Sequence, residues 1–504
     1  MDDALGKGSA RRGAGGRRHA VVVGGSLAGL LAAHVLAEHA ERVTIVERDR
    51  LPDEPGVRPG VPQGRHVHVL LEGGQLALDA LLPGFMAGLR AAGAPRVGMP
   101  SDMVQWQGGR WFRRTEATTH IYTGSRGQVE HLVRARVLAN PLISVLGSTE
   151  AVGLAGDARR VRGLLVRERG AGADAEPRTL EADLVVDASG RGTRADRWLS
   201  AIGAEPPEEE TIDTGLAYAS RLYRNTSDHL GTGALGYYVY PSADQVYSGG
   251  VLPLEDGRHL VILAGLRGDE PPTDEEGFTA YAARFPHPFI HEWMKEAVPE
   301  SAPFGFRRTS NVRRRYDRPG RRPAGFLATG DALCTFNPIY GQGMAVAAMS
   351  AVALRDALAD PRRVPTTRRV QRALFEASRQ AWDISAGADR AMPGAAGSAV
   401  ATRVVDRPAG WYLGRVQQRY PGDPVIGPAF RSVLTLTSPV SALFAPQVVR
   451  AALFGPVAET PSGPPLEREA PTCRSPGRRT WPPRTPTRPP SRSGAAAARS
   501  ASGR

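Results

Sequence analysis

Small residues at turn spacing interrupt the first apolar segment of the chain. The stretch VVVGGSLAGLLAA, residues 21–33, places Gly24, Ser26 and Gly29 between a run of valines and an apolar helical pattern. Residues of this size permit a tight turn and a close approach of backbone amides to a pyrophosphate, at the positive end of a helix. The pattern predicts a dinucleotide-binding turn, whose candidate residues are Gly24, Gly25, Ser26, Leu27, Ala28 and Gly29.

A carboxylate at the end of the next apolar run supports this interpretation. Glu47 closes the segment RVTIVE, eighteen residues after Gly29, and Arg48 follows it. An acidic side chain at this distance accepts hydrogen bonds from the adenosine ribose hydroxyls, and its charge disfavours a bound 2′-phosphate. We therefore expect Glu47 and Arg48 to contact the nucleotide.

The elements that must hold these residues follow from the hydrophobic pattern. Residues 19–47 predict a strand, a tight turn, a helix and a second strand, which together form a βαβ unit. An export signal or a membrane anchor fits the same segment less well, because the three glycines, His34 and Glu38 interrupt its apolar run. No membrane-spanning segment is expected.

A second cluster of chemically suited residues lies about three hundred positions further on. Residues 325–349, GFLATGDALCTFNPIYGQGMAVAAM, predict a strand, a turn that contains proline, and an apolar helix. Asp331 at the strand end can accept from ribityl hydroxyls, and a glycine-flanked helix start offers amides and a positive dipole to the N1/C2 edge of a flavin. The cofactor-binding candidates here are Asp331, Pro338, Gly341, Gln342, Gly343 and Met344.

The paired motifs GGSxAGL and GD…P…GQGM resemble those of the FAD-dependent monooxygenases of the aromatic hydroxylase type. Four further segments resemble the actinobacterial branch that contains the polyether-ionophore epoxidases: residues 60–74, 125–138, 183–199 and 253–278. The resemblance covers residues 19–450 and implies epoxidation or hydroxylation of a hydrophobic, polyketide-like substrate of secondary metabolism. Molecular oxygen would react through a C4a-hydroperoxyflavin, so the resemblance implies no catalytic acid or base.

The same resemblance implies further cofactor contacts, and the sequence departs from the family pattern at one motif. Carried over by position, Arg126 lies near the flavin or the pyrophosphate, and Arg65 and His66 lie on the segment leading to the cofactor. Aromatic hydroxylases carry Asp-Gly in the middle motif, whereas this chain has Ser189-Gly190. NADH or NADPH remains the expected electron donor, either directly or through a separate flavin reductase.

The expected fold class is α/β: a Rossmann-like FAD-binding domain of the glutathione-reductase type, an inserted antiparallel β-sheet substrate domain and a helical C-terminal region. The FAD-binding domain is expected at 19–95, 125–205 and 305–360, the substrate domain at 96–124 and 206–304, and the helical region at 361–458, with disordered tails at 1–18 and 459–504. In the substrate domain, Tyr218, Tyr237, Tyr238 and Tyr240 are candidates to line a pocket, although about half must face away from it.

Composition limits the remaining classes of function. The net charge is +13, but residues 1–18 and 459–504 contribute nine of these charges, so a nucleic-acid-binding body is not expected. The two cysteines, Cys334 and Cys473, can form neither a disulfide framework nor a cysteine-rich metal site, and a reducing cytoplasm is the expected location.

Three alternatives to a monooxygenase remain. A reductase or dehydrogenase of the geranylgeranyl-reductase type shares both FAD motifs but reduces an alkene. A flavin halogenase is disfavoured, because a Trp-x-Trp-x-Ile-Pro motif is absent and the two lysines, Lys7 and Lys295, are poorly placed for catalysis. A nucleic-acid or membrane-surface protein would depend on the basic tails.

Overall fold

The computed structural model describes residues 18–66, 68–172, 175–224, 233–401 and 407–469. The chain divides into two units, Met1–Glu469 and Ala470–Arg504, and the second unit lies wholly outside the described residues. The predicted disordered tails therefore fall mostly outside the described residues. Residues 459–469, assigned to the C-terminal tail from sequence, are described and form hydrogen bonds to the body: the buried Arg114 side chain donates to the carbonyl oxygens of Pro465 and Leu466 at 3.2 and 2.8 Å.

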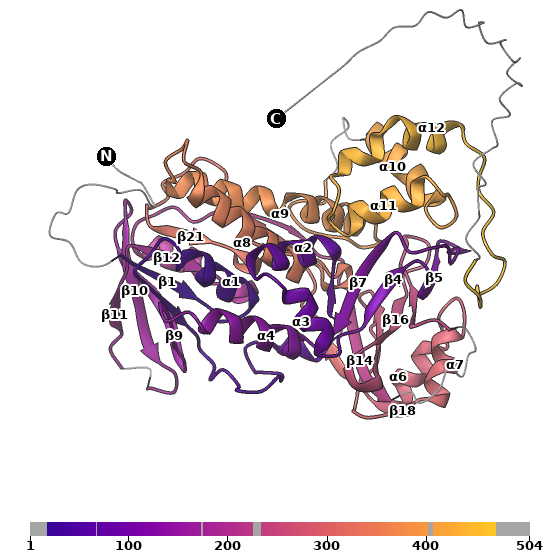
Figure 1. Ribbon diagram of the computed structural model, residues 1–504, viewed down its shortest axis with the longest axis horizontal. Helices are drawn as coiled ribbons and strands as arrows, with labels where there is room; N and C mark the ends of the chain where they lie inside the picture. The colour runs from indigo at the N-terminus through magenta and orange to yellow at the C-terminus, as the bar shows by residue number, and fades with distance from the viewer. Residues whose placement is uncertain (1–17, 67, 173–174, 225–232, 402–406, 470–504) are drawn as a thin grey trace, which may run out of the picture. The chain divides into compact units, whose positions relative to one another are not determined.

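A five-stranded parallel sheet forms the first layer of the fold (Figure 1). Its spatial order is β21-β12-β1-β2-β8, with neighbouring strands paired in parallel. The bounds are β1 His19–Val23, β2 Arg42–Val46, β8 Ile143–Leu146, β12 Leu184–Asp187 and β21 Phe326–Ala328. Valine and isoleucine dominate β1 and β2 because parallel strands are covered on both faces. The predicted βαβ unit is confirmed by β1, α1 (Leu27–Leu36) and β2.

Helices from three distant parts of the chain pack together beside this sheet. Helix α1 contacts β1, β2 and β12 and packs against both α4 (Arg126–Leu138) and α8 (Gly343–Ala359). A three-stranded antiparallel sheet of β9 (Thr149–Gly156), β10 (Val161–Glu168) and β11 (Arg178–Glu181) contacts β12 through β10. Helix α8 begins within the second motif, at Gly343, which confirms the helix predicted there.

The second layer is a larger, mostly antiparallel sheet. Its order is β18-β14-β17-β16-β15-β5-β6, and β19 pairs with β14. The bounds are β5 Met103–Gln107, β6 Arg110–Trp111, β14 Ala217–Arg224, β15 Gly236–Val239, β16 Ser248–Pro253, β17 Arg258–Gly265, β18 Val298–Pro299 and β19 Phe304–Phe306. The pairing of β5 with β15 is parallel, because β5 comes from an earlier segment of the chain rather than from a neighbouring hairpin. Helices α6 (Glu275–Ala282) and α7 (Phe289–Glu296) cover one face with an aromatic cluster that contains Phe278 and Trp293.

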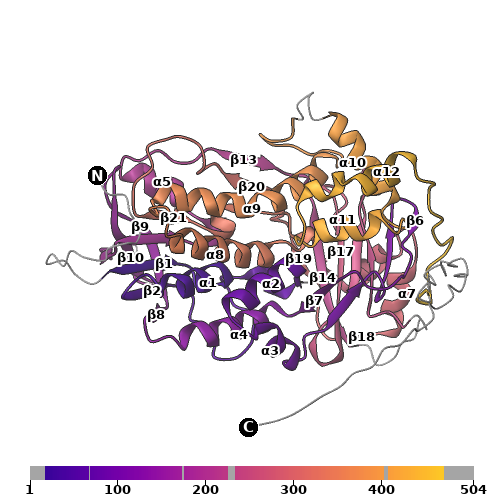
Figure 2. The same ribbon diagram turned by 45° about the horizontal axis from the view of Figure 1, so that its top comes forward.

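Two small sheets and further helices connect these layers. The first small sheet contains β3 (His68–Leu70), β4 (Arg96–Met99) and β7 (Thr119–Gly124), and the second contains β13 (Glu209–Ile212), β20 (Asn311–Arg314) and β22 (Cys334–Thr335). The remaining helices are α2 Glu72–Leu81, α3 Phe85–Ala91, α5 Ala195–Ala201, α9 Thr367–Arg390, α10 Arg407–Arg419, α11 Ile426–Leu434 and α12 Pro446–Phe454. Figure 2 shows α9 beside α8 and β20, consistent with the contacts between these elements.

The structure confirms the predicted α/β class, with a Rossmann-like parallel sheet, a β-sheet domain and a helical C-terminal region. The boundaries expected for separate domains stay a prediction, because residues 1–469 group as one compact unit. Within the described part of the chain, no helix has the length and hydropathy needed to cross a bilayer.

Candidate functional site

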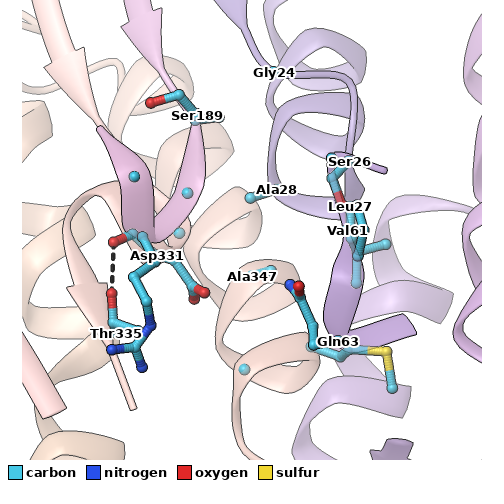
Figure 3. Close-up of a pocket in the computed structure, with 18 of the residues that line it drawn as sticks. Gly24, Ser26, Leu27, Ala28, Val61, Gln63, Ser189, Asp331, Thr335 and Ala347 are labelled. Carbon is cyan, nitrogen blue, oxygen red and sulfur yellow. Dashed lines mark hydrogen bonds between the residues drawn. The ribbon is translucent and has the colours of Figure 1, made fainter. Parts of the chain in front are cut away.

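A cavity of about 420 Å³ lies where the parallel strands end (Figure 3). Its lining residues follow the carboxyl ends of four strands: Gly24 after β1, Glu47 after β2, Ala188 after β12 and Gly330 after β21. The carboxyl edge of a parallel sheet is where such folds bind nucleotides. In Figure 3, Ser189 and Asp331 lie on one side of this cavity, and Ser26, Val61 and Gln63 lie on the other.

The turn between β1 and α1 explains why glycine is needed at two positions. Gly24 has φ of +102°, a left-handed conformation that favours glycine. A Cβ atom on Gly29 would lie 1.8 Å from the Gly24 carbonyl oxygen, so the helix can approach the strand only if residue 29 lacks a side chain. The Ser26 hydroxyl donates to Glu130 at 2.7 Å and accepts from Arg126 at 2.8 Å, which leaves the first amides of α1 available to an anion.

Glu47 is buried at 4% exposure and is held in one orientation. One carboxylate oxygen accepts from the Gly25 amide at 2.7 Å, the other from the Asp49 amide at 2.9 Å, and Arg58 lies 3.2 Å from the former. Burial lowers the pKa of Arg58, but the carboxylates of Glu130, Glu47 and Asp49 outweigh burial and raise it overall. The cluster therefore presents a fixed carboxylate at the nucleotide end of the cavity.

The two sequence motifs meet at one close contact. Gly330 has φ of +58°, and a Cβ atom there would lie 2.6 Å from the Cβ of Ala28. Asp331 follows at the cavity wall, where its carbonyl oxygen accepts from the Thr335 hydroxyl at 2.8 Å (Figure 3). Burial raises the pKa of the Asp331 carboxyl, and Arg191, Arg126 and Arg314 oppose that rise. A carboxylate is thus placed beside the helix start of the first motif.

Unpaired polar atoms test whether the cavity suits FAD. The Gln342 side chain lines the cavity at 2% exposure, and its Oε1 atom has no hydrogen-bond partner among the described residues. Nε of Arg126 also lacks a hydrogen bond there, although it lies 3.6 Å from the Glu130 carboxylate in an ion pair. A buried acceptor without a donor costs about 1–3 kcal/mol, so a ligand N–H or O–H would satisfy it. Together with the open backbone at Gly343, where an added Cβ would meet nothing within 4 Å, these atoms fit a flavin nucleotide.

Most of the predicted cofactor-binding residues line this cavity. Those that do are Gly24, Ser26, Leu27, Ala28, Glu47, Arg48, Arg126, Asp331, Pro338, Gly341, Gln342, Gly343 and Met344. Gly25 and Gly29 do not line the cavity but contact residues that do: the Gly25 amide donates to Glu47, and Gly29 packs against the Gly24 carbonyl oxygen. Arg65 and His66 are not among the lining residues: the Arg65 guanidinium lies 5.0 Å from the centre of the Phe304 ring, and His66 Nδ1 is 3.0 Å from the Ser220 hydroxyl.

His68, two residues after His66, does line the cavity. Its Nδ1 lies 3.0 Å from the His66 carbonyl oxygen, which can only accept, so Nδ1 carries the proton. Burial, followed by the charge of Arg126, lowers the pKa of His68 to about 3, and the ring stays neutral near pH 7. Its Nε2 atom is therefore a hydrogen-bond acceptor.

Other lining residues come from segments without a periodic signal. These include Arg58, Val61 and Gln63 in a proline- and glycine-rich loop, and Arg191 and Arg308 near the second sheet. Of the four tyrosine candidates, Tyr218 lines the cavity, whereas Tyr237 packs against Phe289 in the cluster under α7.

The middle motif around Ser189-Gly190 has its carboxylate, Asp187, inside the fold and not at the cavity wall. Asp187 is fully buried and accepts hydrogen bonds from the Ser189 amide at 2.9 Å, the Ser189 hydroxyl at 2.6 Å and the Thr193 hydroxyl. Burial raises the pKa of Asp187, against the effect of these donors. Asp187 thus stabilises the turn from inside, and Ser189 faces the cavity.

Comparisons with known proteins agree with this site. A family model described as "FAD binding domain" matches residues 17–383. The curated Protein Rv3254 of Mycobacterium tuberculosis is 35% identical over 350 residues, which cover 68% of this chain and 73% of that protein.

Two solved structures illustrate the likeness of the fold. The flavin-dependent brominase Bmp2 aligns with a TM-score of 0.61 at 15% identity, covering 86% of this chain and 98% of the brominase. The p-nitrophenol 4-monooxygenase PnpA from Pseudomonas putida DLL-E4 aligns with a TM-score of 0.56 at 16% identity, covering 84% and 98%. At these identities the two structures support the fold alone.

Proposed function

We propose that this chain, which belongs to the FAD binding domain family and is an FAD-dependent oxidoreductase, is a monooxygenase. Its proposed substrate is hydrophobic and polyketide-like. One observation carries the proposal. A single cavity extends from the nucleotide-binding turn at Gly24 to Tyr218 and Phe306 of the large β-sheet. It joins a cofactor site to an aromatic wall against which an apolar substrate can lie.

The cavity lining supports an assignment of the residues that would hold FAD. Glu47 would accept hydrogen bonds from the adenosine ribose, and the amides of α1 with Arg126 would bind the pyrophosphate. Asp331 would accept from the ribityl hydroxyls, and the start of α8 with Gln342 would face the flavin.

When bound, FAD would supply redox chemistry in which two electrons from a nicotinamide donor and O₂ place one oxygen atom on a carbon of the substrate and release the other as water. The protein's part is to exclude water and to orient the substrate. The rings of Tyr218 and Phe306 pack 5.3 Å apart, and burial raises the pKa of Tyr218, so its hydroxyl stays protonated as a hydrogen-bond donor. Epoxidation and hydroxylation are both compatible with such a wall.

An experiment can distinguish direct reduction of the flavin by the nicotinamide donor from reduction through a separate flavin reductase. Anaerobic NADH or NADPH added alone bleaches the flavin if the donor binds directly, whereas bleaching only after addition of a flavin reductase indicates a separate partner. The replacement of the motif aspartate by Ser189, with Asp187 turned into the fold, favours the second case.

The proposed reaction is tested with ¹⁸O₂ and a panel of alkenyl polyketide-like esters. A monooxygenase gives a product that carries one ¹⁸O atom, with donor consumed in proportion. The reductase alternative predicts alkene reduction under anaerobic conditions and no ¹⁸O in the product, which would contradict our proposal.

Halogenation has less support from the site. Lys295, the one lysine among the described residues, lies on α7 and pairs with Glu292 at 3.0 Å, and it does not line the cavity. The likeness to the brominase therefore concerns the fold.

A further inference from the structure

A buried carboxylate lies behind the turn that closes the flavin end of the cavity. Asp389 is 2% exposed on the last turn of α9, outside the range matched by the family model. Its oxygens accept hydrogen bonds from the side-chain amides of Asn311 at 2.6 Å and Asn337 at 3.0 Å, and from the Tyr340 hydroxyl at 2.6 Å. All three donors are neutral groups.

The surrounding hydrogen bonds fix the orientation of both amides. The Asn311 side-chain oxygen accepts from the Asn337 backbone amide at 2.8 Å and from the Ser385 hydroxyl at 2.6 Å. The Asn337 side-chain oxygen accepts from the Ile339 amide at 3.2 Å. Because these oxygens are already used as acceptors, the two NH₂ groups point at Asp389, and this arrangement suits an ionised carboxylate.

Two of the three donors, Asn337 and Tyr340, belong to the segment that forms the cavity wall, whereas Asn311 lies on β20. Asn337 precedes the short helical turn Pro338–Tyr340 and Tyr340 ends it, and Gly341 follows with φ of +64° before α8 begins at Gly343. Asn337, Pro338, Gly341, Gln342 and Gly343 all line the cavity. On its other side, the turn packs Ile339 against a cluster that contains Leu216 and Tyr218 of the β-sheet domain.

Burying an ionised carboxylate at this place costs free energy unless hydrogen bonds replace those that it makes with water. Burial raises the pKa of Asp389, the hydrogen bonds from Tyr340, Asn337 and Asn311 oppose that rise, and the nearby charge of Asp213 adds to it. A buried charge whose partners are neutral donors is retained only while every hydrogen bond is made, so the network has little freedom to shift. A rigid turn at this place would present Gln342 and the amides of α8 to the flavin in one position.

We propose that Asp389 is a positioning residue for the flavin: its carboxylate holds Asn337 and Tyr340 and so determines where the Pro338–Gly343 segment meets the cofactor. This inference rests on FAD binding, but not on the oxygenation reaction proposed above. The negative charge behind the segment also disfavours extra negative charge on the flavin. Its removal should therefore raise the midpoint potential as well as weaken FAD binding.

Three variants of the full-length protein test the role of Asp389. Asp389→Asn removes the charge and turns an amide donor toward other donors, so we expect the FAD dissociation constant to rise at least about tenfold, as for loss of a charged hydrogen bond. Tyr340→Phe removes one donor and should raise it about threefold. Asp383→Asn removes a carboxylate from an exposed position of the same helix and should change neither the constant nor the potential.

The measurements are FAD titration by fluorescence, the flavin midpoint potential, the visible flavin spectrum and the melting temperature, all without substrate. A purely structural role predicts that Asp389→Asn lowers the melting temperature while the FAD dissociation constant, potential and spectrum stay at wild-type values, and that result would overturn the proposal. If Asp389→Asn does not fold, Tyr340→Phe decides: wild-type affinity and potential in that variant overturn the proposal. Because no oxygenation is measured, failure of the proposed monooxygenase reaction would appear separately.

Discussion

At the scale of single residues, the site depends on buried charges that are held by several hydrogen bonds each. Glu47, Asp187 and Asp389 are all nearly inaccessible to solvent, and each accepts bonds from donors on the loop that it stabilises. Only Glu47 reaches the cavity itself. The three carboxylates therefore serve different functions, which substitution can separate.

Replacing Glu47 by Gln should weaken FAD binding about tenfold or more, because a hydrogen bond to a charged acceptor contributes about 1.5–3 kcal/mol. The new amide NH₂ group would also oppose the amide of Gly25 or Asp49, so the melting temperature should fall. Fluorescence titration with FAD measures the first effect and calorimetry the second. Glu54→Gln, at an exposed position of the following loop, is the matched control; equal FAD affinity in the two variants would argue against the assignment of Glu47.

His66 and His68 should make the folded state sensitive to acid. Burial, followed by the charge of Arg65, lowers the pKa of His66 to about 4, and burial with Arg126 lowers that of His68 to about 3. Between these values and 6.5, the unfolded chain binds protons that the folded chain does not, so the free energy of unfolding falls as the pH drops. Each histidine contributes a slope of about 1.4 kcal/mol per pH unit.

Urea unfolding at pH 7, 6 and 5 measures this dependence. Buried carboxyl groups with raised pKa values, such as Asp331, act in the opposite direction, so the informative quantity is the difference between the wild type and His68→Gln. We expect the variant to lose about one proton from the slope below pH 6. An unchanged slope would show that His68 is protonated in the folded state.

At the scale of elements, the two helix starts that face the cavity respond differently to an added methyl group. Gly29→Ala should destabilise the fold by about 3 kcal/mol, because its Cβ would overlap the Gly24 carbonyl oxygen. Gly343→Ala meets open space and should leave the melting temperature of the apoprotein unchanged or slightly higher, but it should weaken FAD binding. Thermal melts with and without FAD distinguish the two; normal FAD binding by Gly343→Ala would place the flavin away from α8.

The elements differ in how far their sequence predicted them. The β1-α1-β2 unit and the start of α8 were predictable because glycine spacing and hydrophobic period are local properties. The sequence pattern does not distinguish His66 from His68, which begins the short strand β3; only His68 lines the cavity, and contact of His66 with the cofactor stays a prediction. Arg58 and Asp389 could not be found, because only the tertiary fold brings Arg58 to Glu130 and Asp389 to Asn311.

At the scale of the whole molecule, the cavity-lining residues and the basic C-terminal segment occupy separate parts of the sequence. The lining residues lie between Val23 and Ala347. Residues 470–504 carry eight arginines and no acidic residue, so residues 1–469 keep a net charge of +5 out of +13. Any affinity of the chain for polyanions should therefore depend on a segment that the flavin site does not use.

Removal of residues 470–504 should leave the FAD content and the melting temperature unchanged, while salt-dependent binding to duplex DNA or heparin falls steeply. Cationic side chains bind polyanions through counterion release, so the slope of log affinity against log salt should become shallower in the truncated protein. Comparing both proteins at 50 and about 200 mM salt provides the measurement. A truncated protein that is colourless and no longer binds FAD would show that the flavin site needs the segment, and DNA binding that survives truncation would place a polyanion site on residues 1–469.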